Sequence, residues 1–408
     1  MNLSPYRLVL AQPRMRAVTL LAFLSRIPAT AAGLTLTLHV LTTHKLGYAE
    51  AGLAGAFGMV GIGVGSPLAG RFVDRLGARP VVAVTTAAQC VYWAVAPTLG
   101  YRWLLVTAFV SVVLCIPVFG LIRQYMAALV PAEQRRTAFA VDSMAVELSY
   151  MLGPALAVAG VTAFGSTRTM YLVGAGLVAA GVSMIVMNPP VQSEEEARTA
   201  TRVPRRAWLN RGLVAVLAAT ATATFVLSAT ELSVVASLTN AHATAWTGLV
   251  IALWCVYSLI GGFVYGGLRR PVAPLLLVGG LGVMTVPVAL FDGWWWLLPI
   301  ALIPGGLLTA PSLAATVDSL SSCVPASARG EAMGLHGTAL TIGIAAGSPV
   351  AGAVIDAHGP TWGYAMAGGV GVLLVLAAAP FWPRHAPTRS ATPTATATPV
   401  PPIMKVTS

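Results

Sequence analysis

The sequence predicts an all-α membrane protein with twelve transmembrane helices in two pseudo-symmetric six-helix bundles. Three observations support this fold class. The 408 residues are 57% hydrophobic and only 9% charged, whereas an ordinary soluble domain carries roughly 25% charged residues. The apolar residues form continuous runs that are long enough to cross a bilayer as helices. The two halves of the chain also share a spaced pattern of residues, which indicates a parallel repeat of six helices.

The low charge content excludes several protein classes. So few charged residues cannot cover the surface of a soluble protein of this size, and most of the surface must therefore face lipid. This argument excludes a soluble enzyme, a disordered chain and a small domain stapled by disulfides. A β-barrel would show alternating segments of about ten residues, whereas these apolar runs are continuous.

Twelve stretches reach the length of about 20 apolar residues that a spanning helix requires. The least distinct boundary lies between the ninth and tenth stretches, where Asp292-Gly293 marks a short turn. The predicted spans are residues 17–41, 49–70, 80–100, 103–129, 138–163, 168–188, 212–238, 246–267, 271–291, 295–320, 331–355 and 361–383.

The sequence contains no pattern that predicts catalysis. The first apolar run has full length and lacks a clear cleavage site, so we expect it to remain as a span. The four cysteines lie far apart in or at the ends of spans, without the spacing of metal ligands. Neither a P-loop nor an H-E-x-x-H motif is present. We therefore expect no cofactor, no metal site and no enzyme activity.

The basic residues predict how the chain is oriented. With the N-terminus inside the cell, 20 of the 24 Lys and Arg residues fall on the cytoplasmic side. Lys45, Arg102 and Arg168 fall outside, and Arg26 lies within the first span. This asymmetry predicts a multi-pass protein of the cell membrane, inner or plasma membrane, with both termini in the cytoplasm. It also explains the net charge of +11 without a nucleic-acid partner.

A polar stretch divides the chain into two halves. At an offset near 194, Val130-Pro131-Ala132 aligns with Val324-Pro325-Ala326. The C-terminal residues are rich in Thr, Pro and Ala, which is typical of disorder. We expect an N-terminal six-helix bundle over 1–188, a cytoplasmic linker over 189–211, a C-terminal six-helix bundle over 212–385 and a disordered cytoplasmic tail over 386–408.

The connection between the second and third predicted spans carries a motif. It reads Gly70-Arg71-Phe72-Val73-Asp74-Arg75-Leu76-Gly77-Ala78-Arg79. This stretch resembles the signature loop G-x-x-x-D-R-x-G-x-R of the major facilitator superfamily. The number of spans, the central linker and the half repeat agree with that resemblance up to about residue 385.

The resemblance implies a transporter that alternates between two states, with this loop acting as a latch between the bundles. Asp74 is expected at the N-terminal end of span eleven, where the helix dipole favours a carboxylate. Gly70 allows close helix packing, and Arg75 and Arg79 anchor the loop to headgroups or carboxylates. A short basic turn that only sets topology is the alternative. Because Gly266–Pro271 lacks the acid, we expect a latch on one side only.

Span five contains Gly153-Pro154, which resembles a degenerate form of a motif found in drug/proton antiporters. The flanking glycines of that motif are missing, with Met151 and Leu152 among the residues in their place. The arginine that such antiporters carry in the middle of span four is also absent. The pattern leaves open an antiporter motif or a proline kink packed against small residues.

A few ionisable residues lie within the predicted spans, where each needs a partner or a water-filled cavity. At about 1.5 Å per residue, Arg26 and Glu147 reach nearly the same depth. We predict that they face a central cavity and interact directly or through substrate, with a structural ion pair as the alternative. Glu231 lies nearer the outer face, where it could carry a proton, bind a cationic substrate or simply be hydrated.

Four further residues are expected near the cytoplasmic ends of the spans. Arg123 and Asp142 should lie at one depth, and the repeat places Asp318 and His336 at the matching depth in the second half. We interpret them as inner-gate contacts. His336 is also a candidate proton carrier, although a structural role is the alternative.

These features predict a secondary active transporter. We expect proton-coupled efflux of a small amphipathic organic molecule, such as a drug or secondary metabolite, by an actinomycete-type member of the family. One alternative is a proton-coupled uptake symporter for an organic anion held by Arg26. Another is a non-transporting membrane receptor or assembly partner, which would not need the cost of burying Glu147 and Glu231. The expected partners are a small-molecule substrate, protons and the lipid bilayer, and we expect a monomer.

Overall fold

The computed structural model describes residues 4–46, 48–193, 203–243, 246–268 and 272–382. The predicted tail over 386–408 and residues 194–202 of the predicted linker lie outside the described residues. All regular elements in the described ranges are helical. By length and composition, eleven helices within these ranges can span a membrane, and twelve when the bent pair 295–301 and 303–323 is counted as one span. The predicted fold class is therefore confirmed.

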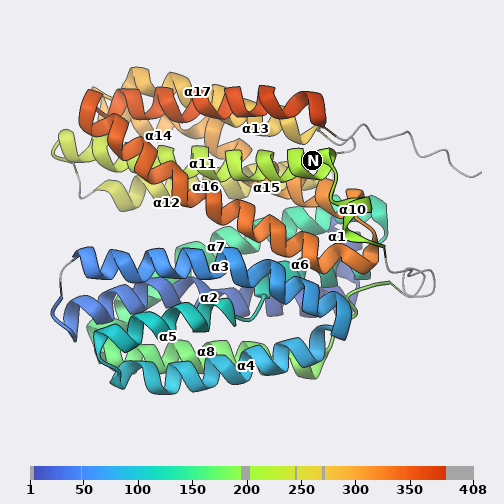
Figure 1. The fold of residues 1–408 in the computed structure, drawn as a ribbon. Coiled ribbons are helices and arrows are strands. Elements are labelled where there is room, and N and C mark those ends of the chain that lie inside the picture. Colours follow the sequence, from blue (N-terminus) through green and yellow to red (C-terminus); the bar gives the residue numbers. More distant parts are fainter. Residues whose placement is uncertain (1–3, 47, 194–202, 244–245, 269–271, 383–408) are drawn as a thin grey trace, which may run out of the picture.

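Figure 1 shows the helices as two bundles that lie side by side, with α1 at one end of the boundary between them. The helices of the first bundle are α1 (Ser4–Ala11), α2 (Pro13–Thr42), α3 (Tyr48–Leu76), α4 (Ala78–Val95), α5 (Tyr101–Val113), α6 (Val118–Leu129), α7 (Ala132–Phe164) and α8 (Ser166–Met187). The short helix α10 (Arg205–Trp208) precedes the second bundle, which contains α11 (Arg211–Asn240), α12 (Thr247–Gly266), α13 (Pro274–Thr285), α14 (Leu298–Ala301), α15 (Ile303–Cys323), α16 (Arg329–His358) and α17 (Pro360–Ala378). Short 3-10 turns extend several of them: η1 (Ala96–Thr98), η3 (Val286–Phe291), η4 (Trp295–Leu297), η5 (Ala326–Ala328) and η6 (Ala379–Phe381).

Two predicted spans are interrupted rather than continuous. The stretch 103–129 divides into α5 and α6 just before Val118. The stretch 295–320 bends by 42° between residues 301 and 303. Pro117 and Pro304 explain the two breaks, because proline lacks the N–H that a helix interior needs and its ring displaces the preceding turn.

The bundles meet along two pairs of helices that the repeat relates to each other. In the first interface α3 packs on α16, and in the second α12 packs on α7. Glycines allow backbones to touch at the first interface: a Cβ at Gly70 would overlap the Gly330 carbonyl, and one at Gly334 would overlap the Ser66 backbone. Small residues at such contacts allow helices in a membrane to approach closely.

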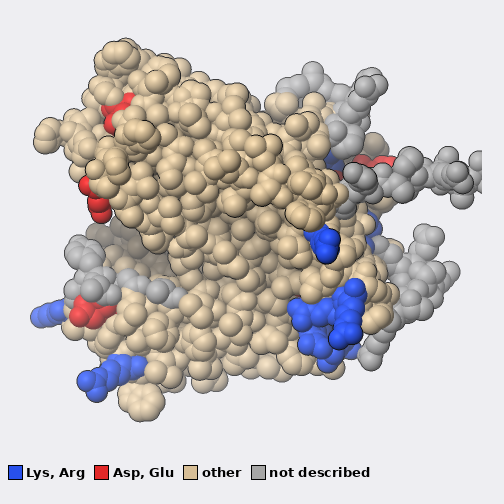
Figure 2. All heavy atoms as spheres, turned by 45° about the horizontal axis from the view of Figure 1, so that its top comes forward, with Lys and Arg blue, Asp and Glu red and all other residues tan. Residues whose placement is uncertain are grey.

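The two ends of this boundary differ. One end, here called the latched end, holds α1, α10 and the starts of α7 and α16. Among the described residues, no hydrogen bond or ion pair joins the bundles beyond Gly63 on α3 and Glu147 on α7. Figure 2 shows a recess between the bundles on the left, opposite the larger group of basic side chains. The molecule is therefore closed at the latched end and separated at the other, which we call the open end.

Candidate substrate and proton site

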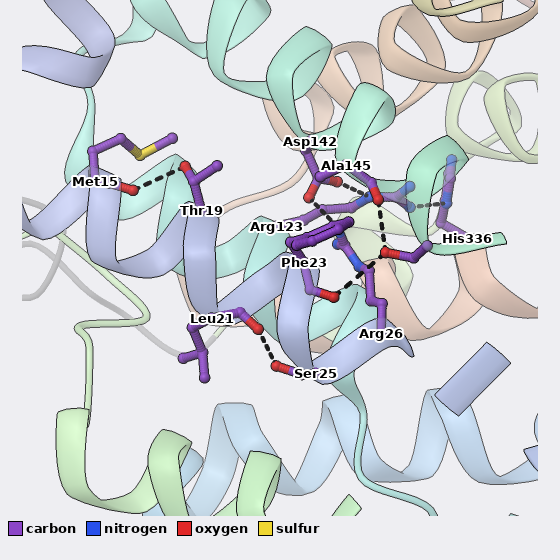
Figure 3. Close-up of polar contacts among 11 residues, drawn as sticks. Met15, Thr19, Leu21, Phe23, Ser25, Arg26, Arg123, Asp142, Ala145 and His336 are labelled. Atoms are coloured by element: carbon purple, nitrogen blue, oxygen red, sulfur yellow. Dashed lines mark hydrogen bonds and ion pairs between the residues drawn. The ribbon is translucent and has the colours of Figure 1, made fainter. Parts of the chain in front are cut away.

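A cluster of four side chains lies inside the closed part of the boundary (Figure 3). The Asp142 carboxylate pairs with Arg26 on one oxygen, at 2.7 Å from Nη1. Its other oxygen accepts from Nε of Arg123 at 3.1 Å. Nη1 of Arg123 lies 3.2 Å from Nδ1 of His336 on α16. We call Arg26, Arg123, Asp142 and His336 the charge cluster, and it joins both bundles.

The contacts of His336 determine where its ring carries a hydrogen. A guanidinium has only donors, so Nδ1 of His336 must accept the hydrogen bond from Arg123. The ring is then neutral and carries its hydrogen on Nε2, 3.3 Å from the Thr316 hydroxyl oxygen. Thr316 donates its own hydrogen to the Leu313 carbonyl at 2.8 Å, so its oxygen is available to accept. The pattern requires a neutral imidazole.

The charge cluster is sealed and holds more positive than negative charge. Arg26 is 0% exposed and Asp142 is 1% exposed. The Arg26 guanidinium lies over the Phe119 ring, 5.0 Å from its centroid, where the electron-rich face attracts a cation. Two guanidiniums share one carboxylate, and among the described residues no hydrogen-bond acceptor meets Nε or Nη2 of Arg26. The cluster thus has spare donors.

The predicted direct interaction of Arg26 with Glu147 is wrong for this state, because Arg26 pairs with Asp142 instead. Both carboxylates lie on α7, but five residues separate them. At about 100° per residue, five residues turn a side chain by roughly 140° around the helix. The depth estimate from the sequence considered the distance along the helix and not the face on which each carboxylate lies.

Glu147 makes a separate contact between the bundles. Ser258 on α12 donates its hydroxyl hydrogen to a Glu147 oxygen at 2.9 Å. This is the contact between α7 and α12 nearest the open end. Tyr150, three residues further along α7, lies within electrostatic range of Glu147, Arg26 and Arg123. Glu147 therefore lies between the charge cluster and the open end.

Glu231 lies on α11, far from the charge cluster. It is exposed, whereas its neighbours on α11 are mostly buried. Cys255 on α12 lies within electrostatic range of both Glu231 and Glu147. The two carboxylates therefore flank the same stretch of α12.

The structure does not pair Asp318 with His336. His336 bonds Arg123 and Thr316, and Asp318 lies two residues beyond Thr316 on α15, within electrostatic range of Tyr265. Residues two apart on a helix are rotated by roughly 200°, which leaves their side chains about 160° apart. Arg123 and Asp142 do lie together, so the inner contacts form one cluster across the bundles rather than two symmetric pairs.

At the first interface Asp74 meets the start of α16. Its two carboxylate oxygens accept from the backbone N–H groups of Gly330 at 2.8 Å and Glu331 at 2.7 Å. These N–H groups lack partners within the helix, and the positive end of the helix dipole favours the carboxylate. Arg205 of α10 pairs with the Glu331 side chain at 3.1 Å, which ties the linker helix to the same end.

The second interface also carries hydrogen bonds between the bundles, so contacts at this end are not confined to the side of Asp74. Thr137 donates to the Gly266 carbonyl at 2.8 Å, and Arg136 donates to the Leu268 carbonyl. Tyr6 donates to the Phe263 carbonyl and stacks on the Phe263 ring at 4.8 Å. Burial raises the pKa of Tyr6, which lies outside the spans, to about 12, so its phenol remains a donor at neutral pH.

The other motif residues have simpler surroundings. Arg75 and Arg79 are exposed beside the end of α3. Gly77 caps α4 with a φ of +86°, a conformation that favours glycine. Gly153 packs against Thr30 of α2, and Pro154 lies inside α7 without ending it. Gly153-Pro154 thus packs within the first bundle.

Two further observations concern other places where a ligand or metal could bind. In the described part of the chain, no group of three or more His, Cys, Asp or Glu residues could hold a metal ion. An apolar groove of about 900 Å³ lies between α11, α16 and α17, with exposed Val214 and Leu374 on its walls. Its lining contains no residue of the charge cluster and no acidic residue, so the candidate site is the central boundary and not this groove.

Sequence reasoning missed three contributors. Thr316 and Ser258 each resemble any small polar residue in a span, although Thr316 lies on the helix that the repeat aligned with Arg123. Tyr6 precedes the first apolar run, and no local pattern connects it to α12. Such partners are separated by 20 to 257 residues, so only the assembled fold reveals them.

Comparison with known proteins agrees with this architecture. The sequence matches the family profile of the Major Facilitator Superfamily over residues 18–291 and 247–406. A search of curated proteins finds no match.

Solved structures share the fold at low sequence identity. The human organic anion transporter MFSD10 (TETRAN) aligns with a TM-score of 0.70 at 17% identity, over 90% of this chain and 100% of that one. The proton:xylose symporter XylE aligns with a TM-score of 0.70 at 15% identity, over 90% and 96%. A bacterial homologue of the iron transporter ferroportin, in an outward-facing state, gives 0.70 at 15%, over 91% and 98%. With its family profile matched over most of its length, the chain belongs to the Major Facilitator Superfamily and is a membrane transporter rather than an enzyme.

Proposed function

We propose that this transporter couples proton movement to the efflux of a small amphipathic organic molecule by alternating access. The observation that carries the proposal is the hydrogen bond between Arg123 and His336, which joins the bundles across the closed part of the boundary. This bond requires an imidazole without a proton on Nδ1. A titratable group therefore holds the latched end closed.

Protonation of His336 would weaken this closure. Both ring nitrogens would then donate, and Nδ1 would face the donor and positive charge of Arg123. Behind Arg123 lie Asp142 and Arg26, and on the other side Thr316 is the only described residue that bonds the ring. Loss of the contact favours opening of the latched end, which links proton uptake to the change of state.

We assign the latched end to the cytoplasm of a cell membrane. The basic side chains gather mainly at this end (Figure 2), and positive residues favour the cytoplasmic side. The described state is then outward-facing, like the similar structure of a ferroportin homologue. We also propose that residues 1–188 and 212–385 form the two bundles and that residues 189–211 form the linker between them.

The anion symporter is the weaker alternative. An organic anion would need access to Arg26, which is fully buried, covered by Phe119 and paired with Asp142. A receptor that does not transport is also weaker, because it has no use for a titratable group between two separable bundles.

Spin labels can test whether proton binding opens the latched end. Cysteines at exposed Val186 and Phe381, in a variant with the four native cysteines replaced by alanine, would report the distance between the bundles. We expect the closed population to fall as the pH is lowered from 8 to 5. His336→Gln keeps one acceptor and one donor but does not titrate, so its closed population should fall less than that of the wild type, with the other carboxylates of the latched end unchanged in both proteins. An equal response in both proteins would contradict the coupling role.

Flux in vesicles tests the transport itself. Purified protein is reconstituted with a pH-sensitive dye inside, and a panel of amphipathic organic compounds is added outside. We expect at least one compound to drive a proton flux that an uncoupler abolishes and that His336→Gln slows at least about tenfold. A substrate flux that is indifferent to the uncoupler and to the pH gradient would overturn proton coupling.

A further inference from the structure

Five side chains lie around the boundary between the charge cluster and the open end. Glu147 and Tyr150 come from α7, Ser258 and Trp254 from α12, and Glu231 from α11. Residues three or four apart share a helix face, so Tyr150 lies one turn from Glu147 and Trp254 one turn from Ser258. Tyr150 lies closer to the open end than Glu147, and Trp254 lies closer to it than Ser258. We call these five residues the acidic chamber.

The exposure of Glu231 shows that it faces this chamber. Between residues 219 and 238 of α11, Glu231 is the only exposed side chain. The helix is otherwise covered by its neighbours in the second bundle, chiefly α16, α17 and α15. Cys255 lies within electrostatic range of both Glu231 and Glu147. The uncovered side of α11 is therefore the side toward α12 and the separated boundary.

The charges around the chamber do not balance. Arg26 and Arg123 are both committed to Asp142. Glu147 accepts only from the neutral Ser258, and no described residue bonds the Glu231 carboxylate. Three carboxylates thus face two guanidiniums and a neutral His336. One positive charge, delivered by a monovalent cation or a proton, would balance the set, whereas an organic anion would increase the imbalance.

The chamber also offers aromatic surface, and a donor without an acceptor lies in its wall. Tyr150 is 53% exposed, and its ring can present an electron-rich face to a cation. The indole N–H of Trp254 is buried without an acceptor among the described residues. A ligand with a positive centre and an apolar or aromatic body matches carboxylates and rings arranged in this way.

We propose that the acidic chamber binds a monovalent organic cation, with Glu231 as its main charge partner and Glu147 as the second. The inference rests on the proposed function and specifies its substrate class. Because a cation and a proton balance the same carboxylates, they compete, and binding of one releases the other. Competition at one site is what an exchanger requires.

Binding to the purified protein in detergent tests the proposal without any gradient. The probes are tetraphenylphosphonium, ethidium and rhodamine 6G as cations, with tetraphenylborate as an anion of nearly the same shape as the first. We expect at least one cation to bind at pH 8 and tetraphenylborate not to bind. Glu231→Gln should weaken cation binding at least about tenfold and Glu147→Gln by less. Lowering the pH to 5 should weaken binding to the wild type and have little effect in the double variant.

Two control variants distinguish a loss of the charge partner from a general effect of the substitution. Glu133→Gln removes an exposed carboxylate at the start of α7 and should leave binding unchanged. Glu231→Asp retains the charge and should bind better than Glu231→Gln, which separates a charge partner from a residue needed for folding. The proposal is overturned if no cation binds, if tetraphenylborate binds equally well, or if Glu231→Gln binds like the wild type. Proton flux driven by a neutral compound would then still support the proposed function, and cation binding without proton flux would support only the chamber.

Discussion

The two interfaces between the bundles use opposite chemistry for the same task. At α3/α16, a side chain of the helix that ends there, Asp74, accepts from backbone N–H groups at the start of α16. At α12/α7, side chains at the start of α7, Arg136 and Thr137, donate to backbone carbonyls at the end of α12. A helix start offers unpaired donors and a helix end offers unpaired acceptors. The second interface therefore needs no acid.

This difference explains why the second half of the repeat has no acidic motif that matches Asp74. An acid at a helix start satisfies two N–H groups and gains from the helix dipole, so one residue suffices. Carbonyls at a helix end are satisfied one at a time by Thr137, Arg136 and Tyr6. We expect the first interface to be sensitive at a few positions and the second to distribute its stability over several.

Gly70→Val should produce the largest effect. A side chain at Gly70 would overlap the Gly330 backbone, and overpacking of this kind costs about 1–3 kcal/mol. The closed population should fall on the order of tenfold or more, as measured by the distance between labels at the latched end. Gly55 on the same helix has open space around its Cβ position, so Gly55→Val is the control. Equal loss in both would indicate a general helix defect.

Asp74→Asn should have the next largest effect. Asparagine retains one acceptor oxygen, so one of the N–H groups of Gly330 and Glu331 loses its partner and the charge at the helix start is lost. The combined cost is about 1–2 kcal/mol, which lowers the closed population roughly tenfold in the same measurement. Asp356→Asn, at an exposed position near the end of α16, should not change it. Normal transport by Asp74→Asn in vesicles would remove the latch role.

Thr137→Val should have the smallest effect of the three. It removes the donor to the Gly266 carbonyl, while Arg136 and Tyr6 still hold α12. The expected cost is about 1 kcal/mol, a change of roughly fivefold in the closed population. Thr137→Ser restores the hydroxyl and should recover the wild-type value. A loss as large as that of Asp74→Asn would show that the second interface does not distribute its stability.

The fold was predictable from the sequence because bilayer physics acts on one chain segment at a time. Each span needs only its own length and composition, and the repeat supplied the two-bundle arrangement. The breaks before Val118 and near Leu302 were missed because a single proline lowers the mean hydropathy of a long apolar run only slightly. Depth along a helix was also predictable, which is why Arg123 and Asp142 were expected at one level.

The site was less predictable because its contacts depend on helix rotation and on partners from other helices. Arg26 pairs with Asp142 rather than with Glu147 because the two carboxylates lie on different faces of α7. The depth of a residue along a helix does not specify its face. His336 was a candidate, but its bond to Arg123 crosses from one bundle to the other. Ser258 and Thr316 gave no signal at all, since a lone hydroxyl in a span has many possible roles.

The backbone contacts at Gly70, Gly330 and Gly334 have a consequence for how such a protein is surveyed by mutagenesis. A systematic alanine scan truncates side chains and treats alanine as the residue that makes no side-chain contacts. Here the contact surface is the backbone itself, and alanine is the bulky variant. A scan read in the usual way would rank these positions as intolerant without explanation. Read as the addition of one methyl group, the result at these three positions would instead mark where the two halves of the transporter touch.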